Sequence, residues 1–306
     1  ALQAHDPDSV VRYRRVRQRP LGPEDAVEMA ATAPETQAAT AAAGDLFTLL
    51  PTWDFDADRA TPLAIEAALV ERPPEDFPEI ETKLLAVLGD PSSTYAAKEF
   101  CCKILRRVGS AGSVAPLAAL LADETMSHMA RYALERDDDP AATEALRQAL
   151  DTVQGTHRIG IIGSLGRLRD AAAVPYLLKA LDDPDPEVFQ AAAAALGQIG
   201  GDAALAGVTA AAAGAQGTRL SVLQDALLRG ADRALADGRA TAALPVYEGL
   251  FAADHAPRVR VAALEGIVRV KGAVAVPLLM SVLTDGDPEL QASAARYVRD
   301  MQGEGV

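Results

Sequence analysis

The chain has 306 residues and a net charge of −14, and 49% of its residues are hydrophobic but only 4% are aromatic. Because nucleic acids and anionic membranes are bound through lysines and arginines that neutralise phosphates, this acidic balance argues against both kinds of partner. No apolar run approaches the roughly 18 residues of a membrane-spanning helix. The hydrophobic residues are mainly alanine, leucine and valine, and residues typical of strands are sparse. Since alanine and leucine are the strongest helix formers, the composition predicts an all-α fold.

Residues 1–45 are predicted to form an N-terminal extension with a helix and an arginine-rich arm. The arginines of this arm are Arg12, Arg14, Arg15, Arg17 and Arg19. We favour a strand-like or disordered tail over an arm that binds an acidic partner. The chain begins at Ala1 without an initiator methionine, so we expect that a preceding segment was removed.

Residues 46–89 are predicted to form a capping repeat, with helices over 61–71 and 78–88. Four of the scarce aromatic residues gather in this segment: Phe47, Trp53, Phe55 and Phe77. The end repeats of a stack differ from the internal ones because one of their faces would otherwise be exposed. We therefore expect these aromatic side chains to close the first repeat.

Asp54 to Asp58 alternate aspartates as the start of a calcium-binding loop does. Such a loop needs glycine at its sixth position and glutamate at its twelfth, where this chain has Arg59 and Ile65. A capped turn before the following helix is the favoured interpretation.

Residues 90–301 repeat with a period near 31. A leucine recurs in the second half of each predicted first helix, and a tyrosine takes its place at the end: Leu105, Leu134, Leu165, Leu196, Leu227, Leu264 and Tyr297. The steps are 29, 31, 31, 31, 37 and 33 residues. A hairpin of two short helices cannot bury both of its apolar faces alone, so such units stack. We expect about six hairpins and a C-terminal helix in a right-handed α-solenoid, followed by a tail over 302–306.

The longest step, from Leu227 to Leu264, predicts an irregularity in the stack. A long first helix over 220–236, ended by the turn at Asp237 and Gly238, would account for it. We expect the superhelix to bend irregularly there.

Each unit opens with a turn rich in aspartate and proline, such as residues 183–187. Aspartate is a good helix N-cap, proline suits the first helical turn, and glutamate there favours the helix dipole. The first helices are predicted to end near glycines: Gly109, Gly166, Gly200 and Gly272. The second helices often carry proline near their first turn: Pro116, Pro175, Pro245 and Pro277.

Residues 183–188 followed by 191–200 resemble the bacterial HEAT-repeat pattern, in which an Asp-rich turn and a Val-Arg pair lead into an alanine-rich helix that ends in Leu-Gly-x-Ile-Gly. Phe189 replaces the usual arginine. Residues 258–264 are a looser match that keeps the Val-Arg pair.

Two further stretches, 95–105 and 129–135, resemble HEAT-repeat proteins of planctomycete and verrucomicrobial type. The resemblance covers about residues 46–301 and implies an α-solenoid of HEAT-type hairpins. It also implies a soluble bacterial protein, either cytoplasmic or exported after removal of a signal. Because one solenoid serves many roles, the resemblance is specific for the fold and not for the function.

Some HEAT-like proteins are enzymes, and deoxyhypusine hydroxylases hold two irons with repeated His-Glu pairs. The histidines of this chain are His5, His128, His157 and His255, and none is followed by glutamate. They fall in different repeats, so surface or packing roles are favoured over a metal site. Neither a phosphate-binding glycine loop nor a nucleophile motif is present. The glycines over 160–166 are expected to serve helix packing, and we expect neither catalysis nor a cofactor.

Cys101 and Cys102 are adjacent, which excludes a framework of spaced disulfides. Neighbouring residues of a helix point about 100° apart. We therefore expect one cysteine to be buried and inert and the other to be partly exposed.

The sequence favours a non-catalytic scaffold that binds a protein partner along the concave face of the solenoid. We expect the second helices to line that face, with exposed residues that carry specificity. The candidate residues are Arg147, Gln148, Tyr176, Lys179, Tyr247 and Met280. The alternative is an accessory subunit of a cofactor- or chromophore-handling enzyme, like the HEAT-like phycobilin lyase components. A third function, nucleic-acid binding, is disfavoured by the charge.

Overall fold

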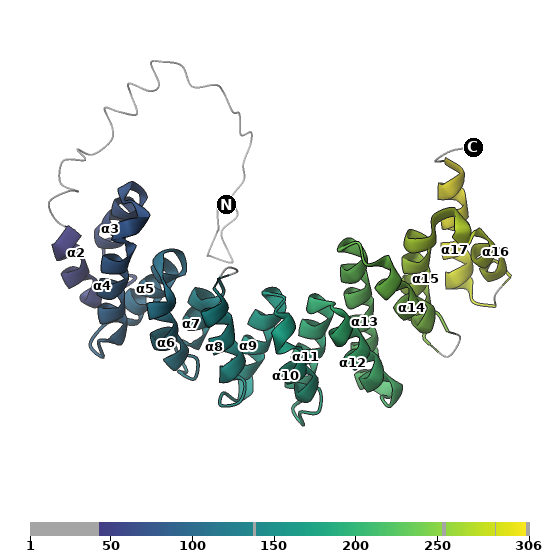
Figure 1. Cartoon of the computed structure of the whole chain (residues 1–306), viewed down its shortest axis with the longest axis horizontal. Coiled ribbons are helices and arrows are strands. Elements are labelled where there is room, and N and C mark those ends of the chain that lie inside the picture. The colour runs from purple at the N-terminus through teal and green to yellow at the C-terminus, as the bar shows by residue number, and fades with distance from the viewer. Residues whose placement is uncertain (1–42, 137–138, 253–254, 285, 304–306) are drawn as a thin grey trace, which may run out of the picture.

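The described part of the chain consists of helices that follow one another along a curved, elongated array (Figure 1). The computed structural model describes residues 43–136, 139–252, 255–284 and 286–303. Helices pack mainly on the elements next or next but one in the chain, as stacked hairpins do. The predicted all-α, right-handed α-solenoid is confirmed. Within the described ranges, no helix is long and apolar enough to cross a membrane. The predicted arginine-rich arm lies outside these ranges.

The stack begins with three helices: α2 (Ala43–Leu49), α3 (Ala60–Glu71) and α4 (Phe77–Gly89). The first helices of the hairpins form one layer, which we call the first layer: α5 (Tyr95–Val108), α7 (Ser127–Leu134), α9 (Gly155–Arg167), α11 (Pro186–Ile199), α13 (Gly217–Ala236), α15 (Pro257–Lys271) and α17 (Pro288–Gly303). The second helices form the second layer: α6 (Ala111–Ala119), α8 (Pro140–Ala149), α10 (Val174–Ala180), α12 (Asp202–Ala213), α14 (Ala240–Leu250) and α16 (Val276–Val282). Short 3₁₀ segments include η2 (Leu50–Thr52) and η4 (Ala171–Ala173).

The repeat leucines form the core that the period predicted. Leu105, Leu134, Leu165 and Leu264 are fully buried, and Leu196 and Leu227 are nearly so. One continuous apolar cluster runs from the N-terminal helices into α15, and a smaller one fills the C-terminal end. The core is therefore linear, as stacked repeats require.

Capped turns begin several of these helices, and the predicted glycines lie near the helix ends. Asp185 caps α11, its side chain accepting a hydrogen bond of 2.8 Å from the backbone N–H of Glu187. Gly200 ends α11 in the left-handed conformation with φ 59°. Gly166 is the next-to-last residue of α9, and the residue with positive φ (52°) after that helix is Arg169.

Gly166 and Gly197 let the first layer pack closely. A Cβ on Gly166 would lie 2.9 Å from the Cα of Ala195, and a Cβ on Gly197 would lie 2.8 Å from the carbonyl oxygen of Ala226. Since no real Cβ is tolerated at such distances, α9, α11 and α13 approach backbone to backbone. The predicted packing role of the glycine-rich run is confirmed at Gly166.

The close packing of the first layer sets the direction of curvature. In Figure 1, α7, α9, α11 and α13 lie on the inner side of the arc, and α6, α8, α10 and α12 follow its outer edge. The expectation that the second helices line the concave face is therefore wrong for α8 and α10. The physical reason is that small residues shorten the spacing of the first layer, so the stack curves towards it.

Aromatic rings pack against one another near the N-terminal end of the stack. Trp53 packs edge-on against Phe55 and Phe100, with ring centroids 5.8 and 6.3 Å apart. The hydroxyl of Thr94 donates a hydrogen bond to the carbonyl of Trp53, and Thr94 also caps α5. Trp53 thus rests partly on α5, outside residues 46–89, and the capping role of that segment stays a prediction. The predicted capped turn is also present, because the Asp58 carboxylate accepts a hydrogen bond from the N–H of Ala60, where α3 begins.

Both cysteines are buried in α5, which contradicts the expected partial exposure of one of them. Cys101 and Cys102 are fully inaccessible and form no disulfide. Burial raises the pKa of Cys102 to about 12 and also raises that of Cys101. Because α5 packs on both α4 and α7, two adjacent directions of the helix face the core.

Candidate interaction surface

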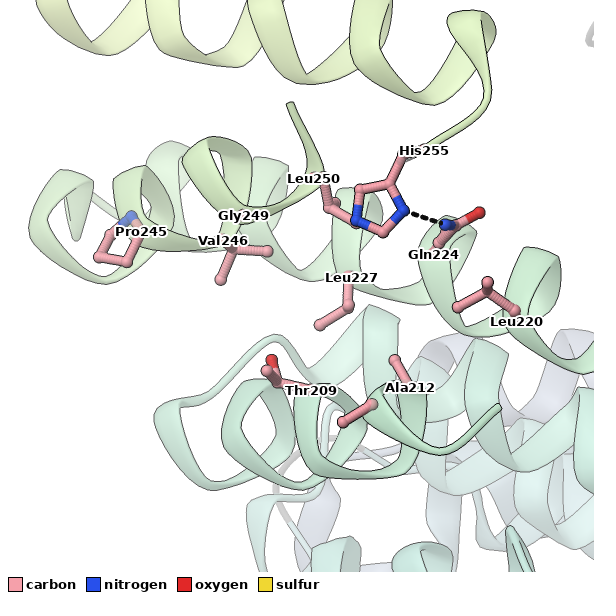
Figure 2. Close-up of a pocket in the computed structure, with 11 residues that line it drawn as sticks. Thr209, Ala212, Leu220, Gln224, Leu227, Pro245, Val246, Gly249, Leu250 and His255 are labelled. Carbon is pink, nitrogen blue, oxygen red and sulfur yellow. Dashed lines mark hydrogen bonds between the residues drawn. The ribbon is translucent and has the colours of Figure 1, made fainter. Parts of the chain in front are cut away.

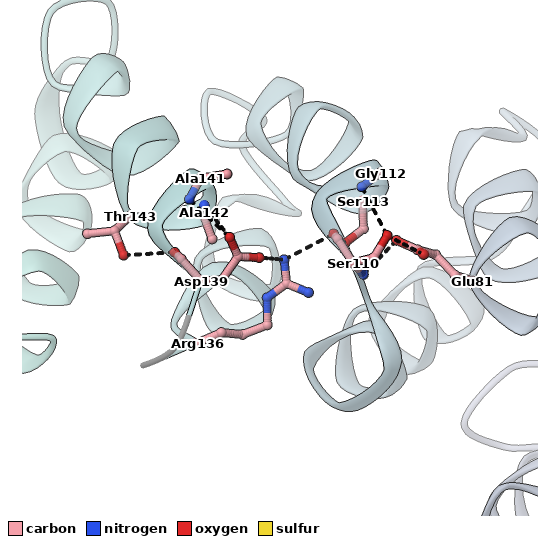
Figure 3. Close-up of polar contacts among 9 residues, drawn as sticks. All are labelled: Glu81, Ser110, Gly112, Ser113, Arg136, Asp139, Ala141, Ala142 and Thr143. Atoms are coloured by element: carbon pink, nitrogen blue, oxygen red, sulfur yellow. Dashed lines mark hydrogen bonds and ion pairs between the residues drawn. The ribbon is translucent and has the colours of Figure 1, made fainter. Parts of the chain in front are cut away.

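The turns along one edge of the solenoid are joined by buried polar contacts (Figure 3). Glu81 of α4 accepts hydrogen bonds of 2.8 Å from the backbone N–H and the hydroxyl of Ser110, which in turn caps α6. Arg136 is 8% exposed and pairs at 2.5 Å with Asp139, which caps α8. The same guanidinium donates to the carbonyl of Ser110. These charges fix the register of neighbouring repeats, so we assign them a structural role.

Arg147, one of the predicted partner-binding residues, belongs to the same kind of contact. Its guanidinium pairs with Glu144 at 2.5 Å and with Asp170 at 2.6 Å, and its side chain is 15% exposed. Asp170 caps η4 before α10, so this pair ties α8 to the next hairpin. Gln148 is exposed and donates to Glu144 at 2.9 Å.

Tyr247 is not exposed as predicted. Its ring is 1% exposed, it lies against Gly266 of α15, and its hydroxyl donates to Asp232 at 2.7 Å. Burial and this hydrogen bond raise the pKa of Tyr247 above its ordinary value. The missing side chain of Gly266 makes the room for the ring, which the local sequence around Tyr247 does not reveal.

Tyr176, Lys179 and Met280 are exposed, on α10 and α16. The six predicted residues belong to four helices of the second layer, α8, α10, α14 and α16, and Tyr247 among them is buried. A partner-binding role for the exposed ones stays a prediction.

A different set of residues lines an open groove on the first layer, which we call the arginine groove. The groove has a volume of about 570 Å³ and is formed by the C-terminal parts of α9, α11 and α13. Its lining residues are Gly166, Arg167, Arg169, Gly197, Gln198, Arg229, Asp232 and Arg233. The two glycines that draw the helices together also leave its floor without side chains.

Two of the four arginines in the groove are engaged by acidic residues. Arg167 pairs with Glu135 of α7, and Arg233 pairs with Asp237 at 2.6 Å. Burial alone would raise the pKa of Glu135, but hydrogen bonds from Arg167 and Ser164 outweigh it and lower that pKa. Both pairs use carboxylates that do not line the groove.

The other two arginines have no such partner. Neither Arg169 nor Arg229 makes a side-chain hydrogen bond or ion pair with a described residue. Asp232, the one acidic residue of the lining, is already held by Arg269 at 2.9 Å and by the hydroxyl of Tyr247. The groove therefore carries an excess of positive charge on a chain whose net charge is −14.

Part of this charge has a structural explanation. Arg167 and Arg233 lie in the last turns of α9 and α13, where cations complement the helix dipole. Arg229 lies almost two turns before the end of α13, beyond the reach of that effect. The sequence did contain a clue, because Arg167 and Arg229 each stand two residues after a repeat leucine. Sequence reasoning missed them because it searched the second helices.

Comparison with known proteins agrees with the geometry of the hairpins. Residues 143–227 match the family model of HEAT repeats. This segment of the solenoid is thus similar to HEAT repeats. No curated protein shows significant sequence similarity to the chain.

Two solved structures align with most of the chain at low structural similarity. Human deoxyhypusine hydroxylase in complex with glycerol is 15% identical, and the alignment covers 78% of this chain and all of that one, with a TM-score of 0.35. The complex of CpcE and CpcF of phycocyanin lyase from Nostoc sp. PCC7120 is 19% identical. Its alignment covers 96% of this chain and 99% of that chain, with a TM-score of 0.34.

Proposed function

We propose that the protein is a non-catalytic scaffold that binds a protein partner along the inner side of its arc, and that the arginine groove takes an acidic segment of that partner. The observation that carries the proposal is the pair of unpartnered guanidinium groups, Arg169 and Arg229, in a groove across three successive HEAT repeats. This proposal moves the expected binding surface from the second helices to the first.

The chemistry of the groove favours carboxylates. A guanidinium offers a planar fork of donors that matches a carboxylate in two parallel hydrogen bonds. The groove is open and crosses α9, α11 and α13, so an extended segment can contact several repeats at once. Because the rest of the chain is acidic, the local positive charge steers such a segment to this place and repels it elsewhere.

The first experiment measures binding of two labelled 12-residue peptides, one alternating glutamate with glycine and one alternating lysine with glycine, by fluorescence anisotropy at low salt. We expect the acidic peptide to bind and the affinity to fall as salt is added, since the contacts are charged. Combined substitution Arg169→Glu and Arg229→Glu should weaken binding by about tenfold or more, because each lost charge-assisted hydrogen bond is worth about 1.5–3 kcal/mol.

Lys179→Glu is the matched control, because Lys179 is an exposed cation on the outer edge, in α10. It makes the same change of charge and should leave the affinity within about twofold. The proposal fails if the acidic peptide does not bind, or if the Lys179 variant loses as much affinity as the groove variant.

A second experiment looks for the partner itself. A photo-cross-linking residue placed at Gln198, which is exposed in the groove, should capture a polypeptide in the native host. The same residue placed at Tyr176 reports on the outer edge. Capture only from position 176 would return the binding surface to the second helices.

A further inference from the structure

Apolar surface lies at several places outside the arginine groove. One is a pocket of about 330 Å³ in the region between α12, α13 and α14, which we call the widened region (Figure 2). The others are exposed faces of α3 and α16, which lie at opposite ends of the arc in Figure 1. Most of the exposed large hydrophobic residues of the described chain belong to these end elements: Leu49, Phe55, Leu63, Val70, Val274, Val276 and Met280.

The exposed side of α3 forms a surface that we call the N-terminal face. Helix α4 packs on α5 and α6, as α10 packs on α11 and α12, so α3 takes the place of a first helix. The residues of this face are Leu63, Glu66, Ala67 and Val70, and Val70 is 76% exposed. Since residues three and four apart lie on one side of a helix, they form an apolar stripe with one carboxylate.

The exposed sides of η5 (Gly272–Ala275), α16 and α17 form a second surface, which we call the C-terminal face. Val274 of η5 is 78% exposed, Val276 and Met280 of α16 are also exposed, and α16 contains no charged residue. Helix α17 exposes two alanines and two arginines at the same helical spacing: Ala292, Ala295, Arg296 and Arg299. This face is therefore apolar on its second helix and carries positive charge on its first.

The two faces are complementary in shape and in charge. Alanines on both α3 and α17 allow two helices to approach closely. Neither Glu66 nor Arg299 makes a side-chain hydrogen bond or ion pair with a described residue, and Arg296 donates only to the hydroxyl of its neighbour in the chain. The exposed acidic residues of α17, Glu289 and Asp300, lie to one side of the row that contains the arginines. A carboxylate and two arginines are thus available for pairing across a contact between α3 and α17.

We propose that copies of this chain associate head to tail, with the N-terminal face of one copy on the C-terminal face of the next, so that α3 continues the first layer beyond α17. Repeat arrays stay soluble when their end repeats have polar outer faces, whereas exposed apolar patches mark interaction sites. Because two different faces meet, the contact repeats from copy to copy and gives chains or rings. Charge favours this arrangement over pairing of two N-terminal faces, which would bring two Glu66 carboxylates together.

Analytical ultracentrifugation of the full chain tests the association. We expect the weight-average mass to rise about twofold or more across roughly a hundredfold range of concentration. The arginine groove shares no residue with either face, so self-association and binding of the acidic peptide can fail independently. A mass of one copy at every concentration would overturn the proposal and leave residues 1–42 or a different protein to cover the N-terminal face.

Variants of the two ends test the direction of the contact. The N-end variant combines Leu63→Glu with Val70→Glu, and the C-end variant combines Val274→Glu with Met280→Glu. All four side chains are exposed, so both variants should keep the unfolding midpoint of the wild type. We expect each variant alone to be monomeric. An equal mixture should form a complex of one copy of each that grows no further, because each variant supplies the intact face that the other lacks.

Tyr176→Glu is the matched control, because Tyr176 is an exposed large hydrophobic residue on α10, away from both ends. This variant should associate as the wild type does. A mixture of the two end variants that stays monomeric would contradict the proposal. So would dimers of the C-end variant alone, since they would show that two N-terminal faces pair with each other.

Charge reversal tests the pairing of α3 with α17. Glu66→Arg should weaken the association by about tenfold, because it places like charges opposite each other. Adding Arg296→Glu and Arg299→Glu to the same chain should restore it, which a general change in solubility would not do. Without this recovery, Glu66 does not face these arginines and the proposed pairing is wrong.

Discussion

The close-packed layer of α9, α11 and α13 and the widened region between α12 and α14 use small residues in opposite ways. In the close-packed layer, Gly166 and Gly197 face the backbone of the next helix, and an added Cβ would lie under 3 Å from it. In the widened region, Gly249 faces open space. A glycine that faces a neighbouring helix therefore lets the two helices pack closely, whereas a glycine that faces open space leaves room for a pocket.

The close-packed layer and the widened region also present different kinds of surface. The close-packed layer curves the stack and carries charged side chains across adjacent helix ends, which suits an extended polar partner. The widened region instead has mainly aliphatic walls, to which Leu220, Leu227, Val246 and Leu250 contribute. The widened region lies beside the longest step between repeats, the 37 residues from Leu227 to Leu264.

The largest contrast is expected from truncating one repeat leucine in each region. Leu165→Ala removes a fully buried side chain of the close-packed layer and should lower the free energy of unfolding by about 3–5 kcal/mol. Leu227→Ala should cost nearer to 2 kcal/mol, because part of that side chain already faces the pocket. Urea unfolding followed by circular dichroism measures both. Equal costs would mean that the pocket collapses around the truncated Leu227.

A glycine pair sharpens the same comparison. Gly197→Ala places a methyl group 2.8 Å from the carbonyl oxygen of Ala226 and should destabilise the protein by about 1–3 kcal/mol. Gly249→Ala meets nothing and should stabilise it by about 0.5–1 kcal/mol through helix propensity. Opposite signs of the two changes in unfolding free energy would confirm that Gly197 faces a close neighbour and that Gly249 faces open space. A stabilising Gly197→Ala would show that α11 and α13 are farther apart than described.

Much of the fold was accessible from the sequence because the features that build it are local and repeated. The leucine period placed the buried row from Leu105 to Leu264, and the aspartate-proline turns placed caps such as Asp185. The predicted long helix and its turn are confirmed, since α13 ends at Ala236 and Gly238 has φ 76°.

The candidate site could not be predicted because it depends on contacts between helices. A period shows that hairpins stack, but the direction of curvature follows from which layer packs more closely. That depends on Gly166 against Ala195 and on Gly197 against Ala226, 29 residues apart in each case. In the same way, Tyr247 is buried because Gly266 of the next helix leaves room for its ring. No pattern around Tyr247 itself contains that information.

Substitution of Arg147 tests whether this residue of the second layer stabilises the fold or binds a partner. Arg147→Leu leaves Asp170, whose side chain is 10% exposed, without its ion-pair partner. We expect a loss of about 1–2 kcal/mol in unfolding free energy and an unchanged affinity for the acidic peptide. Gln148→Ala, on the same helix and exposed, should stay within about 0.5 kcal/mol. Loss of peptide binding at unchanged stability would restore Arg147 to the binding surface.

The smallest expected effect concerns the pH dependence of the contact between α7 and α9. Glu135 accepts hydrogen bonds from Arg167 and, at 2.6 Å, from the hydroxyl of Ser164. Despite burial, these contacts hold the pKa of Glu135 below its ordinary value of 4.5. Because the unfolded chain then binds more protons than the folded one below that value, the stabilisation is present above about pH 4.5. It is lost as the pH falls through the lower folded pKa.

Glu135→Gln should accordingly be less stable than the wild type at neutral pH, and the gap should narrow as the pH falls below 4.5. Urea unfolding of both proteins across this range measures the gap. Glu187→Gln is the control, because Glu187 is exposed in the first turn of α11. A gap for Glu135→Gln that stays constant with pH would mean that the carboxylate contributes shape rather than charge to the joint between these repeats.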